Sequence, residues 1–250
     1  MSWRQQIDIV RELAVSDFRL KYHDSALGYV WSMLSPALML AVYYVVFRYL
    51  IVVNVPGYVG YLAVGLVYWL FFQDCSCAGI AALVAKAELL RAVRAPAVMV
   101  LASAALSTVI TLAINTVVLG VALAVAGRLS TLAPLALIPL AALTLLATGL
   151  SFLLALAHVR FRDTSLIWNV VLQALFWMTP VVYHVSSQWL WELLHINPLA
   201  RCLTLLRWWL LYGHLPPLRF VVVTLAMCAA VFAIGLWAVL REQSQIPERA

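Results

Sequence analysis

The chain has 250 residues, of which 66% are hydrophobic and only 10% are charged, and its mean hydropathy is +1.01. Soluble domains carry about 25% charged residues, and a core of this size does not hide so much apolar surface from water. The composition therefore excludes a water-soluble globular domain and predicts an integral membrane protein.

Six stretches are long and apolar enough to cross a bilayer, which takes roughly 20 residues per helix. Continuous apolarity over such lengths predicts helices, because only a helix satisfies its backbone within one segment. We expect an all-α integral membrane protein whose transmembrane domain covers residues 29–250. Its six predicted spans cover about residues 30–53, 57–85, 97–126, 134–157, 166–183 and 218–240.

Lysine and arginine are distributed unequally between the two sets of connections. Eleven of the 16 lie near the two ends of the chain and in the loops after the second and fourth spans, and five lie on the other side. Cytoplasmic connections carry an excess of Lys and Arg. Both termini are therefore predicted to be cytoplasmic, in agreement with an even number of spans.

The N-terminal segment has the pattern of an amphipathic helix. Its apolar residues recur mostly at gaps of three or four, which places them on one face of a helix: Trp3, Ile7, Val10, Leu13, Ala14 and Phe18. Such a helix lies in the interface plane with its basic groups toward anionic headgroups. Residues 1–28 are thus predicted to form a cytoplasmic interface helix. Its role stays open between a plain membrane anchor and the cytoplasmic mouth of a transport path.

The loop "KAELLRAVRAP" after the second span combines charged and apolar residues. A short amphipathic helix over about residues 86–95 suits docking in the groove of a partner protein. The alternative is a solvated turn that carries positive-inside charges.

Between the fifth and sixth spans, residues 186–213 are too polar for a span and too apolar for an ordinary loop. Tryptophan prefers the membrane interface, and Asn197-Pro198 interrupts the segment in its middle. The pattern predicts two short helices at the outer interface, and the alternative is a single amphipathic loop.

Motifs for nucleotide and metal chemistry are missing. A phosphate-binding loop ends in Gly-Lys-Ser/Thr, whereas Lys21 follows Leu20 and Lys86 follows Ala85. The five histidines show no metal-ligand spacing. We therefore predict no nucleotide hydrolysis and no metal site in this chain.

Asp74 is the only acidic residue well inside a predicted span. An intramembrane carboxylate is a functional candidate by default. It is equally compatible with a protonated side chain or with a hydrogen bond across a helix interface. Because the sequence places no Lys or Arg in the span near it, a proton relay is disfavoured.

The stretch "SDFRLKYHDSALGYVWSMLSPALMLAVYYVVF" closely resembles the start of the first span in type-2 ABC permeases that export polysaccharides such as O-antigen, teichoic acid and capsule. Further matches follow in order along nearly the whole chain: "GLVYW", "AELLRAVRAP", "FRD", "TPVVY" and "NPL". The family pattern Leu-Gly-Tyr-x-Trp-Ser-x-x-x-Pro corresponds here to Leu27, Gly28, Tyr29, Trp31, Ser32 and Pro36.

The resemblance implies a homodimeric pore in the bacterial inner membrane, with two copies of a separate ATPase subunit below it. ATP and Mg²⁺ then bind to that partner and no cofactor binds to this chain. The N-terminal helix resembles the interface helix near which the lipid-linked glycan enters, and the two short helices resemble periplasmic gate helices. The loop after the second span resembles the coupling helix that contacts the ATPase, with candidate residues Lys86, Glu88, Leu89, Leu90, Arg91 and Arg94.

A hydrated glycan needs a wet or aromatic-lined path, because rings stack on sugar faces and tyrosine hydroxyls bond to sugar hydroxyls. We expect channel contacts at Tyr43, Tyr44, Trp69, Phe72, Asp74 and Trp177. Headgroup contacts, where cations bind a diphosphate strongly, are expected at Arg19, Lys21, Tyr22, Tyr29 and Trp31. Gate residues are expected at Trp189, Trp191, Asn197, Arg201 and Arg207. For any single ring, helix packing or lipid contact is the alternative.

Other functions remain open at this point. One is a type-2 ABC exporter of drugs or small lipids. Another is an intramembrane transferase that acts on lipid-linked sugars, which needs acid/base groups clustered at one membrane face. Only Asp163 and His158 come near to that requirement. Expected partners are thus the ATPase, a second copy, the lipid-linked substrate and membrane lipid, with no nucleic acid.

Overall fold

The structure, a computed structural model, describes residues 3–21, 28–50, 57–86, 96–185 and 187–242. Within these ranges every regular element is helical. Some sequence predictions lie outside the described residues: Tyr22, and from the predicted coupling helix Glu88, Leu89, Leu90, Arg91 and Arg94.

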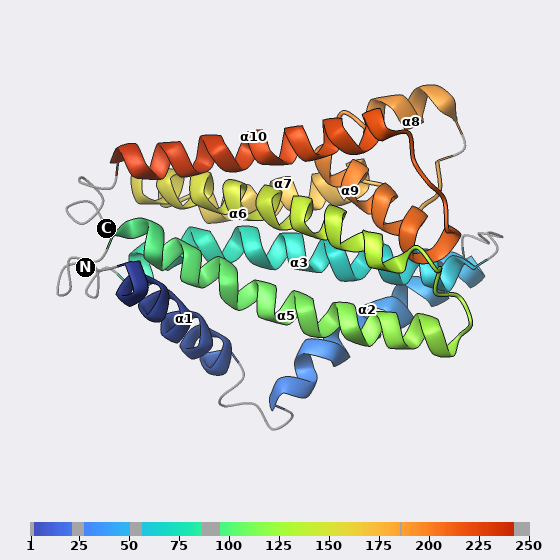
Figure 1. Ribbon diagram of the computed structural model, residues 1–250, viewed down its shortest axis with the longest axis horizontal. Coiled ribbons are helices and arrows are strands. Elements are labelled where there is room, and N and C mark those ends of the chain that lie inside the picture. The colour runs from blue at the N-terminus through green and yellow to red at the C-terminus, as the bar shows by residue number, and fades with distance from the viewer. Residues whose placement is uncertain (1–2, 22–27, 51–56, 87–95, 186, 243–250) are drawn as a thin grey trace.

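Four long helices run side by side along the molecule (Figure 1). Each is long and apolar enough to cross a membrane, and each coincides with a predicted span to within a few residues. They are α3 (Tyr58–Ala85), α5 (Ala97–Val125), α6 (Leu137–Arg160, preceded by the 3₁₀ turn Ala133–Ala136) and α10 (Leu218–Glu242).

Small residues allow these helices to approach closely. A Cβ atom added to Gly149 of α6 would lie 2.5 Å from the Cα of Phe232 in α10, and one added to Gly235 would meet the carbonyl oxygen of Gly149. Close backbone approach at glycine is the usual way in which helices associate within a membrane. Along their length α6 and α10 are therefore held together by close packing.

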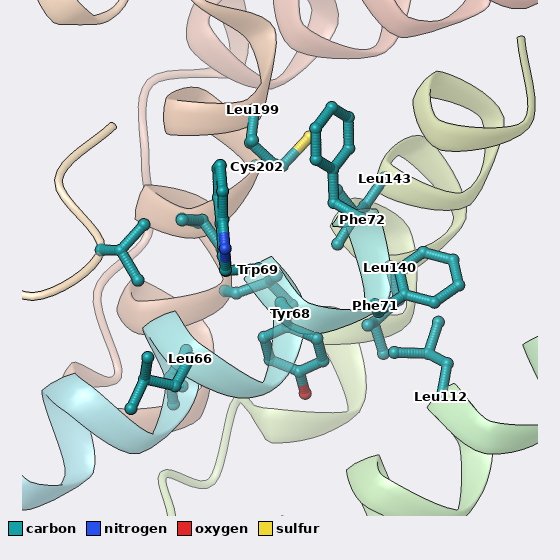
Figure 2. Close-up of a cluster of buried hydrophobic side chains, with 14 of the residues drawn as sticks. Leu66, Tyr68, Trp69, Phe71, Phe72, Leu112, Leu140, Leu143, Leu199 and Cys202 are labelled. Carbon is teal, nitrogen blue, oxygen red and sulfur yellow. The ribbon is translucent and has the colours of Figure 1, made fainter. Parts of the chain in front are cut away.

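Helix α3 is the centre of the bundle. It is apolar all round, as expected of a helix covered on every side, and it packs on α5, α6 and α9. Figure 2 shows Tyr68, Trp69, Phe71 and Phe72 of α3 among leucines of the neighbouring helices. Helix α3 therefore sets the positions of the helices that pack around it.

Two shorter apolar helices correspond to the remaining predicted spans. The first is α2 (Trp31–Val45), which follows the 3₁₀ turn Gly28–Val30 and continues as a π-helical turn, Val46–Leu50. The second is α7 (Thr164–Met178). The prediction that the fifth span continues to residue 183 was wrong, since the chain is not helical after Met178. Pro180 explains this, because a proline disfavours helical geometry in the residue before it, and Thr179 has φ −112° and ψ 131°.

One end of the bundle collects the start of the chain and the end of α10. The predicted N-terminal helix is present as α1 (Trp3–Leu20), which packs along α5 (Figure 1). Lys86, just after α3, donates to Asp17 of α1 at 2.5 Å. At the same end, Arg160 of α6 bonds to Glu242 of α10 at 2.5 Å. These two ion pairs hold together the helix ends that the sequence predicts to be cytoplasmic.

The opposite end carries the segment between α7 and α10. It forms two short helices, α8 (Gln188–Leu194) and α9 (Pro198–Arg207), and α9 continues as a π-helical turn, Trp208–Tyr212. The Asn197 side chain accepts a hydrogen bond from the Leu199 N–H at 2.9 Å, so Asn197-Pro198 ends one helix and caps the next. The predicted pair of helices is thus present, broken where the sequence indicates.

Candidate functional site

Two hollows lie along α2 where it rests on α3. We call the first the hydroxyl-lined hollow. It has a volume of about 280 Å³ and lies between α2, α3 and α5. Its polar lining comes from Ser32, Ser35, Thr108, Thr111, Asn115 and Asp74, together with Lys21.

An ion pair stands at the hydroxyl-lined hollow. The Lys21 Nζ donates to the Asp74 Oδ2 at 2.9 Å, and both side chains are about half exposed. The span of Asp74 holds no Lys or Arg, as the sequence shows, and its cation comes from outside the predicted spans. Its partner lies 53 positions earlier in the chain and is brought there by the packing of α1, which no local pattern reveals.

The structure brings three predicted residues to this hollow, Lys21, Trp31 and Asp74, although the sequence assigned Asp74 to the channel. Arg19 is exposed and does not line it, and only the backbone of Tyr29 is described. A cation and several hydroxyls offer donors to phosphate oxygens and to sugar hydroxyls alike. The hollow is therefore suited to a phosphorylated, hydroxyl-rich headgroup.

The second hollow, which we call the aromatic hollow, lies between α2, α3 and α7 and has a volume of about 580 Å³. Three predicted channel residues line it: Tyr43, Trp69 and Trp177. Phe176 joins them into one cluster, with ring centroids 5.7 Å from Tyr43, 5.2 Å from Trp69 and 5.4 Å from Trp177.

Two other predicted channel residues lie elsewhere. Phe72 is only 2% exposed and belongs to the core around α3 (Figure 2). Tyr44 packs edge-on against Tyr49, with centroids 6.4 Å apart. Neither residue lines the two hollows.

Three amide side chains line the aromatic hollow and were not predicted. They are Gln73 of α3 and Asn169 and Gln173 of α7. Asn169 and Gln173 are four residues apart, so they share one face of the helix. This spacing of polar residues within an apolar stretch was the available signal. Amides both donate and accept hydrogen bonds, so rings and amides together can hold a sugar polymer without fixing it at one position.

A clamp centred on Arg207, a predicted gate residue that is only 3% exposed, lies where the chain leaves α7. Its Nη1 and Nη2 each donate at 2.7 Å, to the carbonyls of Pro180 and Val181. Its guanidinium carbon lies 3.5 Å from the centre of the Tyr61 ring. The clamp thus replaces the helical hydrogen bonds that the chain loses after Met178.

Tyrosines of α3 complete the clamp. The Tyr58 hydroxyl donates to the Val182 carbonyl at 2.6 Å, and the Tyr61 hydroxyl donates to the Tyr183 carbonyl at 2.7 Å. The lack of a side chain at Gly65 makes room for the clamp, because an added Cβ would collide with the Val181 oxygen and the Arg207 side chain. Helices α3 and α9 and the non-helical segment after α7 are thereby fixed to one another.

Two of the remaining predicted gate residues, Trp191 and Arg201, pack against His195, between α8 and α9. Trp191 stacks on the His195 ring at 3.9 Å, and Arg201 donates to the His195 carbonyl at 3.3 Å. Burial lowers the pKa of His195 from 6.5, and the charge of Arg201 lowers it further, against the opposing effect of its hydrogen bond with Trp191. Asn197 also donates to the Thr179 hydroxyl at 3.0 Å, whereas Trp189 is exposed.

No group of three His, Cys, Asp or Glu side chains in the described part of the chain is arranged to hold a metal ion. What the structure assembles instead is a set of rings, amides and hydroxyls along α2. Such a lining binds and guides a polar chain, because each of its groups offers a weak and replaceable contact.

Comparison with known proteins finds a family and several relatives. The sequence profile of the ABC-2 type transporter family matches residues 10–211. The chain is 25% identical over 198 residues to an O-antigen export system permease protein RfbA of Klebsiella pneumoniae, covering 77% of this chain and 76% of that protein. It is 29% identical over 180 residues to the protein of the same name from Myxococcus xanthus, covering 70% and 68%. A second Klebsiella pneumoniae protein of that name is 24% identical over 198 residues.

Proposed function

The chain belongs to the ABC-2 type transporter family, and we propose that it is the membrane-spanning subunit of an ATP-driven exporter of lipid-linked polysaccharide, similar to O-antigen. The relatives named as O-antigen export permeases support this substrate class. The observation that carries the proposal is the aromatic hollow, in which Tyr43, Trp69 and Trp177 lie beside three amides.

In this proposal the glycan passes along the aromatic hollow. Its rings offer faces for sugars, and Gln73, Asn169 and Gln173 exchange hydrogen bonds with successive hydroxyls. The phosphorylated headgroup reaches the chain at the hydroxyl-lined hollow, where Lys21 supplies the cation. The substrate's polar part thus moves from one hollow toward the other along α2.

The assembly follows from one exposed surface. Leu166, Val170 and Met178 are each more than three-fifths exposed, and they belong to α7, which lines the aromatic hollow. We propose that two copies of the chain close it into a pore in the bacterial inner membrane. Both α2 and α7 then cross the bilayer, which makes six spans. Both termini are cytoplasmic, and α8 and α9 form the periplasmic gate.

The energy comes from a second protein. We propose that two ATPase subunits, which bind ATP and Mg²⁺, dock on the loop over residues 86–95. Lys86 at the start of that loop is tied to α1 through Asp17. A movement of the loop is therefore transmitted to the helix that carries Lys21.

The test replaces the two amides of α7 together, Asn169→Leu with Gln173→Leu, in a strain whose surface polysaccharide depends on this chain. We expect export to fall roughly tenfold, because a loss of about 1.4 kcal/mol of contact energy corresponds to a factor of ten. The matched control is Val171→Leu, on the same helix but outside both the hollow and the proposed contact surface. Unchanged export in the double variant at equal protein level contradicts the proposed path. Lost drug resistance with unchanged surface polysaccharide favours a drug exporter instead.

A further inference from the structure

An apolar groove lies on the other side of α2 from the aromatic hollow. It runs between α2 and α5 over α3 and has a volume of about 300 Å³. Met33, Ala37 and Leu40 form one wall, and Val118, Ala122 and Ala126 form the other. Met33, Ala37 and Leu40 are spaced at three and four residues, so a single face of α2 lines the groove. We call this feature the α2–α5 groove.

The two ends of the α2–α5 groove differ from its walls. At the end away from α1 lies Arg128, whose side chain is exposed and forms no ion pair with any residue in the described ranges. At the other end, Pro36 and Asn115 line both this groove and the hydroxyl-lined hollow. One continuous seam therefore leads from the Lys21–Asp74 pair, past apolar walls, to Arg128.

This combination fits an amphiphile with a phosphate head and a hydrocarbon tail. Apolar walls favour a hydrocarbon chain, and a guanidinium at the end favours a phosphate. A resident phospholipid keeps its head in one leaflet and needs a cation at only one end. A lipid that is carried across the bilayer meets the cations at both ends. The seam therefore fits the transported lipid better than a lipid that stays in place.

We propose that the α2–α5 groove holds the hydrocarbon anchor of the transported lipid, with its phosphate at Arg128 once the headgroup has crossed. The inference rests on the proposed export of a lipid-linked polysaccharide and adds the path of the anchor. Anchor and glycan then lie on opposite sides of α2. Helix α2 packs mainly on α3 and only lightly on α5. It can therefore stand between the anchor and the glycan and still move relative to α5.

The test uses photo-crosslinking in cells that make the polysaccharide. Benzoyl-phenylalanine replaces Val118, which lines the groove, or Val121, which is exposed on the same helix outside it. After irradiation the chain is purified and probed with an antibody against the polysaccharide. A ladder of crosslinked glycan is expected at position 118 and not at 121, because only the anchor of the substrate carries sugar. In the Val118 background, Arg128→Gln is expected to reduce the ladder severalfold and Arg128→Lys to retain it.

Two results overturn the inference. One is an equal ladder at positions 118 and 121. The other is capture of phospholipid alone at 118, which mass spectrometry of the crosslinked peptide identifies. Surface polysaccharide is measured in the same cells with and without the chain. If export depends on the chain while position 118 captures no glycan, the anchor path is wrong and the proposed function stands. If export does not depend on the chain, the proposed function itself fails.

Discussion

At the scale of single residues, the most constrained side chain is Arg207. A buried cation is stable only when its donors are paired. Here the guanidinium donates hydrogen bonds to three carbonyls and lies over the ring of Tyr61. The same bonds supply partners to carbonyls of Pro180 and Val181, which lie outside any helix. In a membrane these carbonyls have no water as a substitute. Arg207 is therefore part of the fold as well as of the proposed gate.

We expect Arg207→Leu to destabilise the protein strongly. Each buried carbonyl left without a partner costs about 1–3 kcal/mol, so a total of several kcal/mol is expected. The measurement is the thermal midpoint of the detergent-solubilised protein, followed by size-exclusion chromatography. Arg219→Leu, at an exposed arginine near the start of α10, is the matched control. Equal midpoints for the two variants contradict the clamp.

His195 gives a pH dependence whose sign can be worked out. Its pKa is lower in the folded protein than the ordinary 6.5, because it is buried next to Arg201. Below pH 6.5 the unfolded chain therefore binds a proton that the folded chain refuses. Stability is full above that pH and falls as the pH decreases, by at most about 1.4 kcal/mol per pH unit. We expect the thermal midpoint to drop between pH 7 and pH 5 in the natural chain and to drop less in His195→Gln. Parallel curves contradict this assignment.

At the scale of helices, α1 matters through the residue that it presents. The Lys21–Asp74 pair is half exposed, so it contributes at most about 1 kcal/mol to stability. The pair is proposed to matter for transport rather than for stability, because it places the Lys21 cation at the hydroxyl-lined hollow. We expect Lys21→Ala to reduce export severalfold with little change in thermal midpoint. Arg19→Ala, on an exposed neighbour that does not line the hollow, is expected to retain export within about twofold. Equal losses in the two variants point to a general effect of charge on α1 instead.

The sequence was sufficient for the long helices because their apolar runs are continuous over the length of a membrane. It failed at the end of α7, where the apolar run continues through Val181 and Val182 although the helix stops. Hydropathy measures where a residue is buried and not how its backbone is bonded. The helix break is set by Pro180 and by donors from α3 and α9, which are distant in the sequence.

The candidate site was only partly predictable for the same reason. Tyr43, Trp69 and Trp177 could be proposed because aromatic residues are suited to sugars wherever they lie. Phe72 is aromatic too, but its side chain is buried in the core. Whether a ring lines a hollow or packs in the core depends on its exact position on the helix. The Lys21–Asp74 pair joins segments 53 residues apart and depends on how α1 packs. Contacts of this kind come from tertiary structure alone.

At the scale of the whole molecule, one chain of contacts links its proposed energy source to its proposed substrate. The loop over residues 86–95 begins at Lys86, which pairs with Asp17 at 2.5 Å. Four residues further along the chain, at the end of α1, Lys21 pairs with Asp74. Because Asp17 and Lys21 are separated by about one helical turn, a displacement of the loop moves both ion pairs together. The ATPase is therefore expected to act first on the hydroxyl-lined hollow.

The loop itself provides the last prediction. We expect Leu89→Ala with Arg91→Glu to release the ATPase, because the change removes an apolar contact and reverses a charge on a short docking segment. The measurement is copurification of the ATPase after mild detergent extraction. Asp17→Asn serves as the matched variant: it leaves the docking residues intact but breaks the link to α1. It is expected to retain the ATPase while lowering export. An ATPase that stays bound to the loop variant places docking elsewhere, and full export in Asp17→Asn shows that force reaches the hollow by another route.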